Sequence, residues 1–263
     1  KQEGGKLGDL FAFKQDHIFK DWDDVKANAN NRYDAIGELY GPAAWEALKD
    51  KAGKQPIEPG DVCWADLNND GVINNLDRVK VGNLFPTVTG GFSTTLGYKD
   101  FSLYARFDYA LGHTLYNDLA ARSLGQYQGS FNIIDMVKDS WSETNQDTDI
   151  PKFYYADQLS KKNITRSNNG LTAVDNNSSR FYEKGDYLAL REITLTWNLP
   201  KKWINKALMS NASVYVTGQN LFYITGYTGV SPEPAVDTTY GQGLDNGRYP
   251  TPKTVLLGLS VTF

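Results

Sequence analysis

Three parts of the chain alternate between apolar and polar residues, which is the pattern of β-strands with one apolar face. The clearest part is residues 101–111, where apolar side chains occupy every second position. Residues 91–98 alternate just before it, and Lys99-Asp100 lies between the two, so a β-hairpin is predicted. A run of 11 alternating residues exceeds the usual globular strand and matches the roughly 9–11 residues of a membrane strand.

The other two alternating parts lie toward the end of the chain. Residues 186–199 and 211–219 form one predicted pair of strands, and residues 255–263 form a last one. Pro200 ends the first of these strands, and residues 201–209 are predicted to be a turn or a short helical link. Leu188 and Leu190 lie in the opposite phase to the apolar residues from 193 onward. This change of phase predicts a β-bulge near Arg191-Glu192.

Long irregular segments separate the predicted strands. Within residues 21–60 we expect one helix, which begins at Pro42 and ends at Gly53. A second helix is expected at 131–141, and the polar segments 163–179 and 226–250 are expected to be loops. Loops of this length are uncommon in compact domains but normal on one side of outer-membrane β-barrels. The loop lengths therefore favour a barrel.

Composition and charge exclude several classes of protein. The 263 residues have a mean hydropathy of −0.49 and contain no apolar run near 18 residues, which argues against a membrane-spanning helix. These values do not argue against membrane strands, in which apolar and polar residues alternate. The net charge of −4 is spread without a basic stripe, which argues against nucleic-acid binding. Cys63 is the single cysteine, so no internal disulfide and no cysteine-based metal cluster is expected. The first eight residues lack the apolar segment of a signal peptide, so the mature protein begins here or the chain is a piece of something longer.

Residues 66–77, inside a loop-like insertion at 59–82, have the spacing of a calcium-binding loop. Side-chain oxygens fall at positions 1, 3, 5, 9 and 12, and Gly71 falls at position 6, where the chain turns sharply. Ile73 is expected to point inward, and the flanks are β-like, so a structural Ca²⁺ site is favoured over a sensor. A plain turn rich in Asp, Asn and Gly is the alternative. The predicted ligands are Asp66, Asn68, Asp70, the backbone carbonyl of Val72, Asn74 and Asp77.

No other group of residues predicts catalysis or cofactor binding. His17 and His113 are far apart, and neither has a Cys or His at ligand spacing, so ordinary structural histidines are expected. Carboxylates are plentiful, but nothing singles out the pair that a glycosidase needs. The chain is therefore predicted not to be an enzyme. The carboxylates considered are Glu183, Asp186, Glu192 and Glu233.

Five segments, in order along the chain, resemble the C-terminal part of SusC/RagA-type TonB-dependent outer-membrane transporters of the Bacteroidetes. The most specific is residues 59–92, PGDVCWADLNNDGVINNLDRVKVGNLFPTVTGGF. The others are residues 8–20 (GDLFAFKQDHIFK), 185–200 (GDYLALREITLTWNLP), 214–223 (VYVTGQNLFY) and 249–263 (YPTPKTVLLGLSVTF).

The resemblance implies an all-β fold: residues 1–263 would be the final strands of an antiparallel transmembrane β-barrel of about 22 strands, with long extracellular loops carrying short helices. A rough count gives six to eight membrane strands, too few to close such a barrel, so we expect a C-terminal piece of a longer transporter. The implied function is TonB-energised import of oligosaccharides across the bacterial outer membrane. The implied partners are a SusD-like lipoprotein, the TonB complex through the missing N-terminal region, the rest of the same transporter and outer-membrane lipid, with no nucleic acid.

Three alternatives remain at this stage. The first is a peptide importer of the RagA type. The second is a soluble, calcium-stabilised, sugar-binding β-sandwich, which would pack Leu103, Phe107 and Leu259 in a protein core. The third is a secreted glycosidase fragment, which would need two carboxylates about 5–9.5 Å apart in a cleft.

Overall fold

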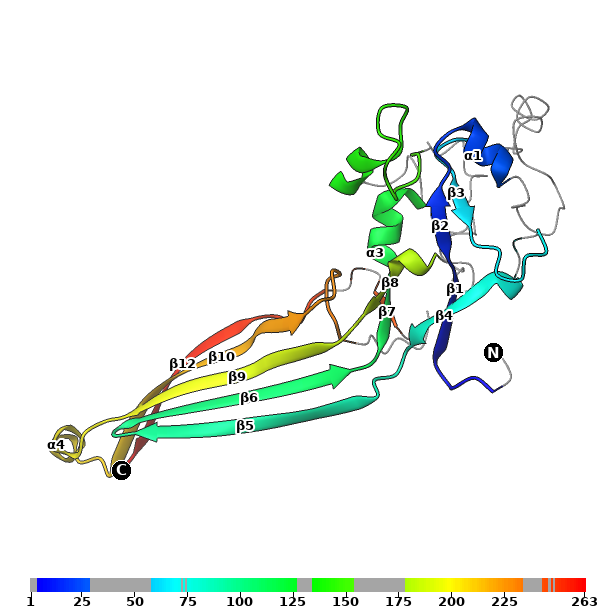
Figure 1. The fold of residues 1–263 in the computed structure, drawn as a ribbon. Helices are drawn as coiled ribbons and strands as arrows, with labels where there is room; N and C mark the ends of the chain where they lie inside the picture. Colours follow the sequence, from blue (N-terminus) through cyan, green and yellow to red (C-terminus); the bar gives the residue numbers. More distant parts are fainter. Residues whose placement is uncertain are drawn as a thin grey trace.

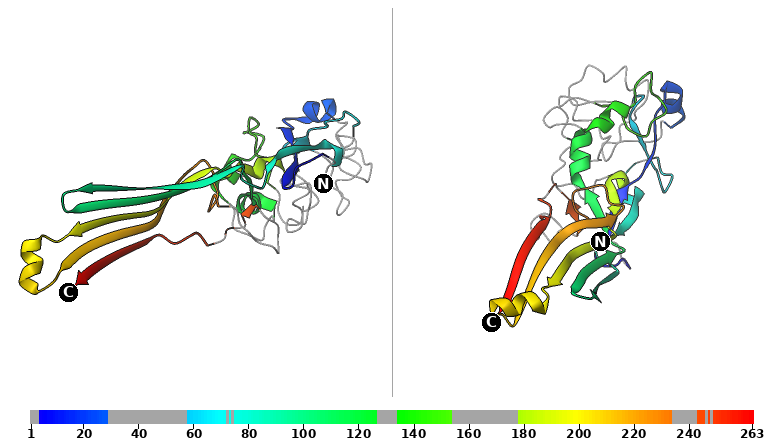
Figure 2. Two further views of the ribbon diagram at one scale, coloured as in Figure 1. Left: turned by 90° about the horizontal axis from the view of Figure 1, so that it is seen from below. Right: turned by 90° about the vertical axis from the view of Figure 1, so that its left-hand side faces the viewer.

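The computed structural model is elongated, with one long sheet at one end and a cluster of short elements at the other (Figures 1 and 2). The sheet carries the long alternating segments of the sequence, and most of the short helices and strands lie in the cluster. The structure describes residues 4–28, 58–71, 73, 75–126, 134–153, 178–233, 243–245, 247 and 249–263.

The long sheet is an antiparallel meander in the order β12-β10-β9-β6-β5. Two short connections lie at the same end: the Lys99-Asp100 turn, and a link between β9 and β10 made of α4 (Lys201–Ile204) and a 3₁₀ turn (Asn205–Ala207). Both connections were predicted from the sequence. The strands are β5 (Val88–Tyr98), β6 (Phe101–Leu111), β9 (Tyr187–Asn198), β10 (Asn211–Thr225) and β12 (Thr254–Thr262).

The described residues hold five such strands, fewer than the six to eight expected. The difference lies partly at the start of the chain, where residues 8–20 form two short strands outside the long sheet. β1 (Asp9–Phe13) pairs with β4 (Arg78–Asn83), and β2 (Gln15–Ile18) pairs with β3 (Val62–Trp64). Within the described residues, β5 and β12 each have one neighbour, so the sheet is open at both edges.

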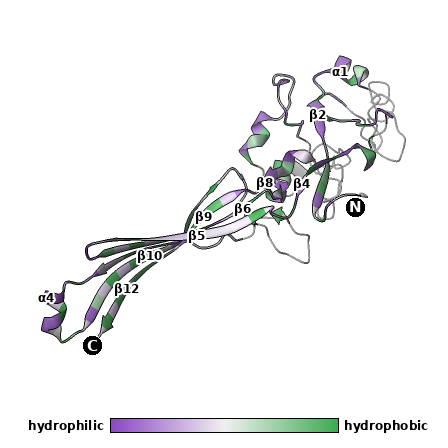
Figure 3. Ribbon diagram, turned by 60° about the horizontal axis from the view of Figure 1, so that its bottom comes forward, coloured by the Kyte–Doolittle hydropathy of each residue, from purple (hydrophilic) through white to green (hydrophobic). Residues whose placement is uncertain are grey.

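The long sheet has one apolar face and one polar face, because the strand register aligns residues of like polarity across all five strands. On the apolar face the side chains stay accessible, as at Leu257 (80% exposed) and Leu259 (65%). Figure 3 shows the alternation of hydrophobic and hydrophilic residues along β10 and β12. One apolar row is Leu96–Leu103–Leu195–Val216–Leu257, and the adjacent polar row is Thr95–Tyr104–Thr194–Thr217–Leu256, in which Leu256 is an exception.

A bulge at Arg191 keeps the apolar face continuous, as the change of phase in the sequence predicted. Glu192 pairs with Arg106 but Leu190 pairs with Phe107, so Arg191 is an extra residue on β9. Without it, Leu188 and Leu190 would turn to the polar face. With it, the row Phe92–Phe107–Leu190–Phe222 stays on the apolar side, and Phe92 and Phe107 stack at 4.9 Å between ring centroids.

The short elements pack on two small cores of their own. One core lies between β2, β3 and α1 (Trp22–Ala27) and includes Phe19, Cys63 and Trp64. The other includes Tyr116, Leu124 and Phe181. The second core is built by β7 (Thr114–Asn117), β8 (Tyr182–Lys184), β11 (Leu244–Asp245), α3 (Asp118–Ala121), a π-helical turn (Arg122–Gln126) and two 3₁₀ turns (Asp135–Asp139 and Ser179–Phe181).

The helix predictions had mixed outcomes. The helix expected at 42–53 lies outside the described residues. The helix expected at 131–141 is a 3₁₀ turn at Asp135–Asp139, and α1 was not predicted although Asp21 caps it by accepting hydrogen bonds from the N–H groups of Asp23 and Asp24. No helix in the described ranges is long and apolar enough to cross a membrane.

Asp9 makes the β1–β4 pairing dependent on pH. Hydrogen bonds from Lys80 and Asn83, each 2.8 Å from Oδ1, lower the pKa of the Asp9 carboxyl from 3.8 to about 2. Because the folded pKa is lowered, the stabilisation is complete above about pH 5 and is lost as the pH falls toward 2. We expect the difference in unfolding free energy between the wild type and Asp9→Asn, measured by urea titration, to be constant above about pH 5 and to shrink steadily as the pH falls to 2. A difference that persists undiminished at pH 2 would contradict this assignment.

Candidate functional site

The polar face of the sheet contains an open hollow where β5, β6 and β9 meet. Its volume is about 560 Å³, and Gly91, one of its lining residues, pairs with Asp108 in the register of β5 and β6. A Cβ at Gly91 would lie 2.9 Å from the Phe107 carbonyl oxygen, so the position requires glycine. The hollow is lined by Gly90, Gly91, Phe92, Ser93, Arg106, Phe107, Asp108 and Arg191.

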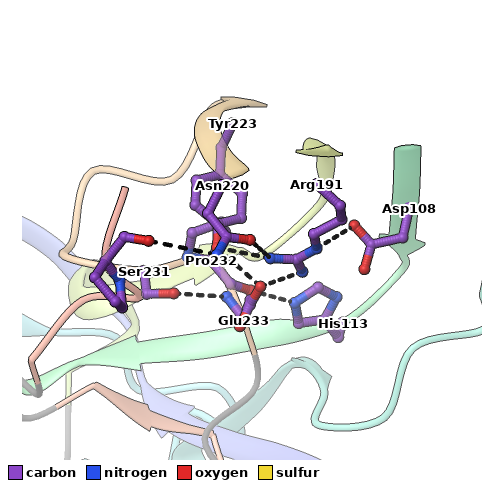
Figure 4. A network of polar contacts seen from close by, with 9 residues as sticks. Asp108, His113, Arg191, Asn220, Tyr223, Ser231, Pro232 and Glu233 are labelled. Atoms are coloured by element: carbon purple, nitrogen blue, oxygen red, sulfur yellow. Dashed lines mark hydrogen bonds and ion pairs between the residues drawn. The ribbon is translucent and has the colours of Figure 1, made fainter. Parts of the chain in front are cut away.

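Arg191, one of the residues that line this hollow, is the centre of a polar cluster (Figure 4). Its Nε donates to Asp108 Oδ1 at 2.6 Å, and its Nη2 forms an ion pair with Glu233. Its Nη1 donates to the Tyr223 hydroxyl at 3.2 Å and to Asn220 Oδ1 at 3.4 Å. The Tyr223 hydroxyl in turn donates to Glu233 Oε1 at 2.8 Å, so each charged group of the cluster has an opposite partner.

The bulge explains why Arg191 occupies this place. As the extra residue of β9 it has no cross-strand partner on β6, and its side chain is free to reach both Asp108 on β6 and Tyr223 on β10. The sequence predicted the bulge, but it did not predict the partners of Arg191. Only the phase change pointed to this position.

Residues 226–233, here called the anchored loop, are fixed at several points beside the Arg191 cluster. His113, which is buried, donates from Nε2 to the Pro232 carbonyl at 2.9 Å. Glu183 accepts from the backbone N–H of Thr228 at 2.9 Å, and Glu233 binds Arg191. The anchored loop is therefore tied through side chains to the connection between β6 and β7, to β8 and to β9.

Tyr227 adds a buried attachment for the same loop. Its hydroxyl donates to Asp245 Oδ2 at 2.8 Å, and the same oxygen accepts from the Val230 N–H at 3.0 Å. Burial, together with this hydrogen bond to Asp245, raises the pKa of the Tyr227 hydroxyl far above its ordinary value. The hydroxyl is therefore a donor throughout the physiological pH range.

The loop at 66–77 is compact and partly matches its predicted geometry. Gly71 has a positive φ of 77°, and Ile73 is 1% exposed, so the turn and the inward anchor lie where they were expected. Asp66 accepts from the Gly71 N–H at 2.7 Å, and the fully buried Asp77 accepts from the Leu67 N–H at 2.9 Å.

The described ligand candidates of this loop form part of one hydrogen-bonded unit. Asn68 and Asp70 are joined by a hydrogen bond of 2.8 Å, and the Asp70 N–H lies 3.2 Å from Asp66 Oδ1. The Asp66 and Asp77 carboxylates accept from backbone N–H groups and the Asp70 carboxylate from the Asn68 amide. The donor set of carboxylate and amide oxygens suits a hard cation. Two of the predicted ligands, Val72 and Asn74, lie outside the described residues, so metal binding stays a prediction.

The histidines and carboxylates considered in the sequence have mainly structural partners. Asp186 accepts from the Gly112 N–H at 2.6 Å, and Glu192 accepts from Thr194 at 3.3 Å. Glu183, Glu233 and His113 hold the anchored loop. His17 lies instead beside Asp16 and Cys63, a grouping that the sequence spacing did not suggest.

Comparison with known proteins relates this arrangement to one family. No protein-family model matches the sequence. TonB-dependent receptor P3 of Formosa agariphila is 31% identical over 243 residues, which cover 88% of this chain and 22% of that receptor. TonB-dependent receptor SusC of Bacteroides thetaiotaomicron is 25% identical over 265 residues, which cover 100% of this chain and 23% of SusC. The RagAB peptide transporter structure superposes with a TM-score of 0.60 and 24% identity, over 78% of this chain and 21% of that one.

The chain is part of a SusC/RagA-like TonB-dependent receptor. It spans less than a quarter of the length of the two relatives named above. The open five-stranded sheet of this receptor segment is accordingly a piece of an antiparallel β-barrel wall in the bacterial outer membrane. The relatives are named as receptors, which fits the prediction that the chain is not an enzyme.

The β-sandwich alternative is not supported by the apolar face of the sheet. A sandwich would need a second sheet on that face, and no described element forms one. Leu259, which the sandwich would bury, is 65% exposed. The lipid of the outer membrane, rather than a protein core, is the environment that this face requires.

Proposed function

We propose that residues 1–263 form the C-terminal part of the wall of an outer-membrane importer that takes up oligosaccharides, energised by TonB and assisted by a SusD-like surface lipoprotein. The observation that carries the proposal is the two-faced sheet: an apolar surface for lipid on one side, and hydroxyl, amide and charged groups on the other. The similarity to TonB-dependent receptors, among them SusC, supports the assignment to import.

Each part of this segment would serve transport without chemistry on the substrate. The apolar face would hold the wall in the bilayer, and the polar face would line the inside of the barrel. The anchored loop would keep the rim of the wall fixed through Arg191 and His113. Partly exposed hydroxyl residues of β9 on the polar face, such as Thr194 and Thr196, would present neutral hydrogen-bonding groups to a passing polar solute.

Import of peptides is the second candidate function. It is suggested by the RagAB peptide transporter, whose chain shares the fold of this segment. The hollow with Arg106, Asp108 and Arg191 places both signs of charge on the polar face, which suits the termini and charged side chains of peptides.

Uptake by cells separates the two candidates. A strain that lacks the full-length receptor is given fluorescent oligosaccharides or fluorescent peptides, with a strain lacking TonB as the reference. Loss of oligosaccharide uptake in both strains is the expected result. Loss of peptide uptake alone would establish the second candidate, and normal uptake of both solutes would overturn the import proposal.

We also propose that the loop at 66–77 binds Ca²⁺ as a structural ion, through Asp66, Asn68, Asp70, Asp77, Asn74 and the Val72 carbonyl. Calcium should raise the melting temperature of the full-length receptor, since an ion that binds only the folded state stabilises it. Asp70→Asn should weaken Ca²⁺ binding by roughly tenfold or more, measured by calorimetry after chelation, because it removes a ligand charge. The control is Asn75→Ala, an exposed residue between two ligand positions. Equal Ca²⁺ affinity in the two variants would overturn this assignment.

A further inference from the structure

The pairing of β2 with β3 brings together three side chains that commonly bind transition metals. His17 lies directly opposite Cys63 in the register of the two strands. One potential ligand atom each from Asp16, His17 and Cys63 lies within 4.8 Å of the other two. Ligand atoms around one tetrahedral zinc ion lie about 3–4 Å apart, because metal–ligand distances are about 2.0–2.3 Å. The three side chains would therefore need at most a small adjustment to share one ion.

The hydrogen bonding of His17 supplies an independent argument for a cation. Its Nε2 lies 3.2 Å from Asp24 Oδ1, and its Nδ1 lies 2.9 Å from Asp16 Oδ2. A neutral imidazole carries a proton on only one of its nitrogens. The second nitrogen therefore directs a lone pair at a carboxylate oxygen, which is unfavourable unless a proton or a metal ion lies there.

Asp24 is held as an outer partner of His17 rather than as a ligand. Its Oδ2 accepts from the Lys20 N–H at 2.9 Å, and its Oδ1 accepts from Asn28 Nδ2 at 2.9 Å. A carboxylate that accepts the N–H of a metal-bound histidine orients the ring and selects its tautomer. With the proton on Nε2, the Nδ1 lone pair of His17 is left to bind a metal beside Asp16.

We propose that Asp16, His17 and Cys63 form a Zn²⁺ site on the loop side of the receptor, with Asp24 as the positioning residue. A thiolate, an imidazole and a carboxylate together favour zinc over calcium or magnesium, which prefer oxygen ligands only. Binding releases the thiol proton of Cys63 to solvent, and three protein ligands leave one position for water. Cys63 is 2% exposed and belongs to a buried cluster, while the side chains of His17 and Asp16 are 34% and 58% exposed, so the site borders solvent on the side of β2.

The site would join β2 to β3, which lie outside the long sheet. The two strands are held by a short ladder with a register shift between Gln15 and His17, and Asp16 lies at that shift. A metal bound to both strands would stabilise this small unit in proportion to metal occupancy. The proposal is separate from transport and from the Ca²⁺ loop.

Cobalt binding to the full-length receptor in detergent tests the proposal, because Co²⁺ reports thiolate ligation by a charge-transfer band in the near ultraviolet. We expect the band in the metal-stripped wild type, its displacement by Zn²⁺, and its absence from Cys63→Ser. Absence of the band from the wild type, or its persistence in Cys63→Ser, would overturn the proposal.

Variants that retain the Cys63 thiol show whether a loss of the band in Cys63→Ser comes from misfolding rather than from the missing ligand. Asp16→Asn and His17→Asn should each weaken Co²⁺ binding at least as much as Asp24→Asn, for which loss of an outer partner predicts roughly 10–100-fold. Asp135→Asn, a matched change of an exposed carboxylate on another element, should leave the affinity unchanged. Wild-type affinity in both Asp16→Asn and His17→Asn would also overturn the proposal, provided that heat-modifiable mobility shows folded protein.

Discussion

Leu195→Arg is expected to destabilise the folded receptor by about 1–3 kcal/mol, the cost of a basic side chain on the lipid face between the bilayer midplane and the interface at the Lys99-Asp100 end. Leu195 lies in the apolar row between Leu103 and Val216 and is 44% exposed to the medium around the sheet. Urea unfolding of the full-length receptor in lipid measures the change, and the amount of heat-modifiable receptor in the outer membrane should fall with it.

Thr196→Arg is the control for this prediction. Thr196 is the next residue of β9 and therefore points to the polar face, where it pairs with Ser102 and Tyr215. An arginine there can remain hydrated, so we expect a loss below about 1 kcal/mol. Equal losses for Leu195→Arg and Thr196→Arg would mean that the apolar face does not meet lipid.

Arg191→Gln is expected to cost about 2–3 kcal/mol and to release the anchored loop, because Asp108 and Glu233 lose the guanidinium that satisfies both carboxylates. The Arg191 side chain is only 16% exposed, so water replaces these contacts poorly. Hydrogen exchange of the anchored loop, residues 226–233, should rise more than exchange in β12, and urea unfolding of the same receptor gives the free energy.

Arg106→Gln separates this effect from the loss of any positive charge at the hollow. Arg106 lies on the same face two residues from Asp108, but it is exposed and has no ion pair to a described residue. We expect little change in loop exchange or in stability. If both variants loosen the loop equally, the specific contacts of Arg191 are not what fixes it.

Local periodicity carried enough information to predict the long strands and their irregularities. Alternation in residues 91–111 gave the hairpin, Pro200 gave the end of β9, and the phase change before Ile193 gave the bulge. Each of these features depends on residues within a few positions of one another, which is why no tertiary information was needed. The family resemblance then supplied the barrel, which alternation alone did not distinguish from a sandwich.

Contacts between distant segments were outside the reach of the sequence. Glu233 meets Arg191 only because β9 and β10 are adjacent and the anchored loop returns over their ends. Cys63 meets His17 only because β2 and β3 pair. Neither contact could be predicted from the sequence, because these polar residues lie outside any periodic pattern. The sequence spacing of His17 gave no indication that the fold places it beside Cys63.

The length of β6 determines the hydrophobic thickness of the bilayer that this segment matches. Its 11 residues carry apolar side chains from Phe101 to Leu111 on one face, which corresponds to about 34 Å along the strand and roughly 26 Å along the membrane normal at a tilt near 40°. That height agrees with the hydrophobic thickness of the bacterial outer membrane, which is thinner than the average bilayer. In thicker bilayers the polar groups just beyond the two ends of β6, the Asp186 carboxylate bound to the Gly112 N–H and the Lys99-Asp100 turn, would be drawn toward the acyl chains. Reconstitution in lipids of increasing chain length should therefore lower the stability of the receptor once the bilayer exceeds this height.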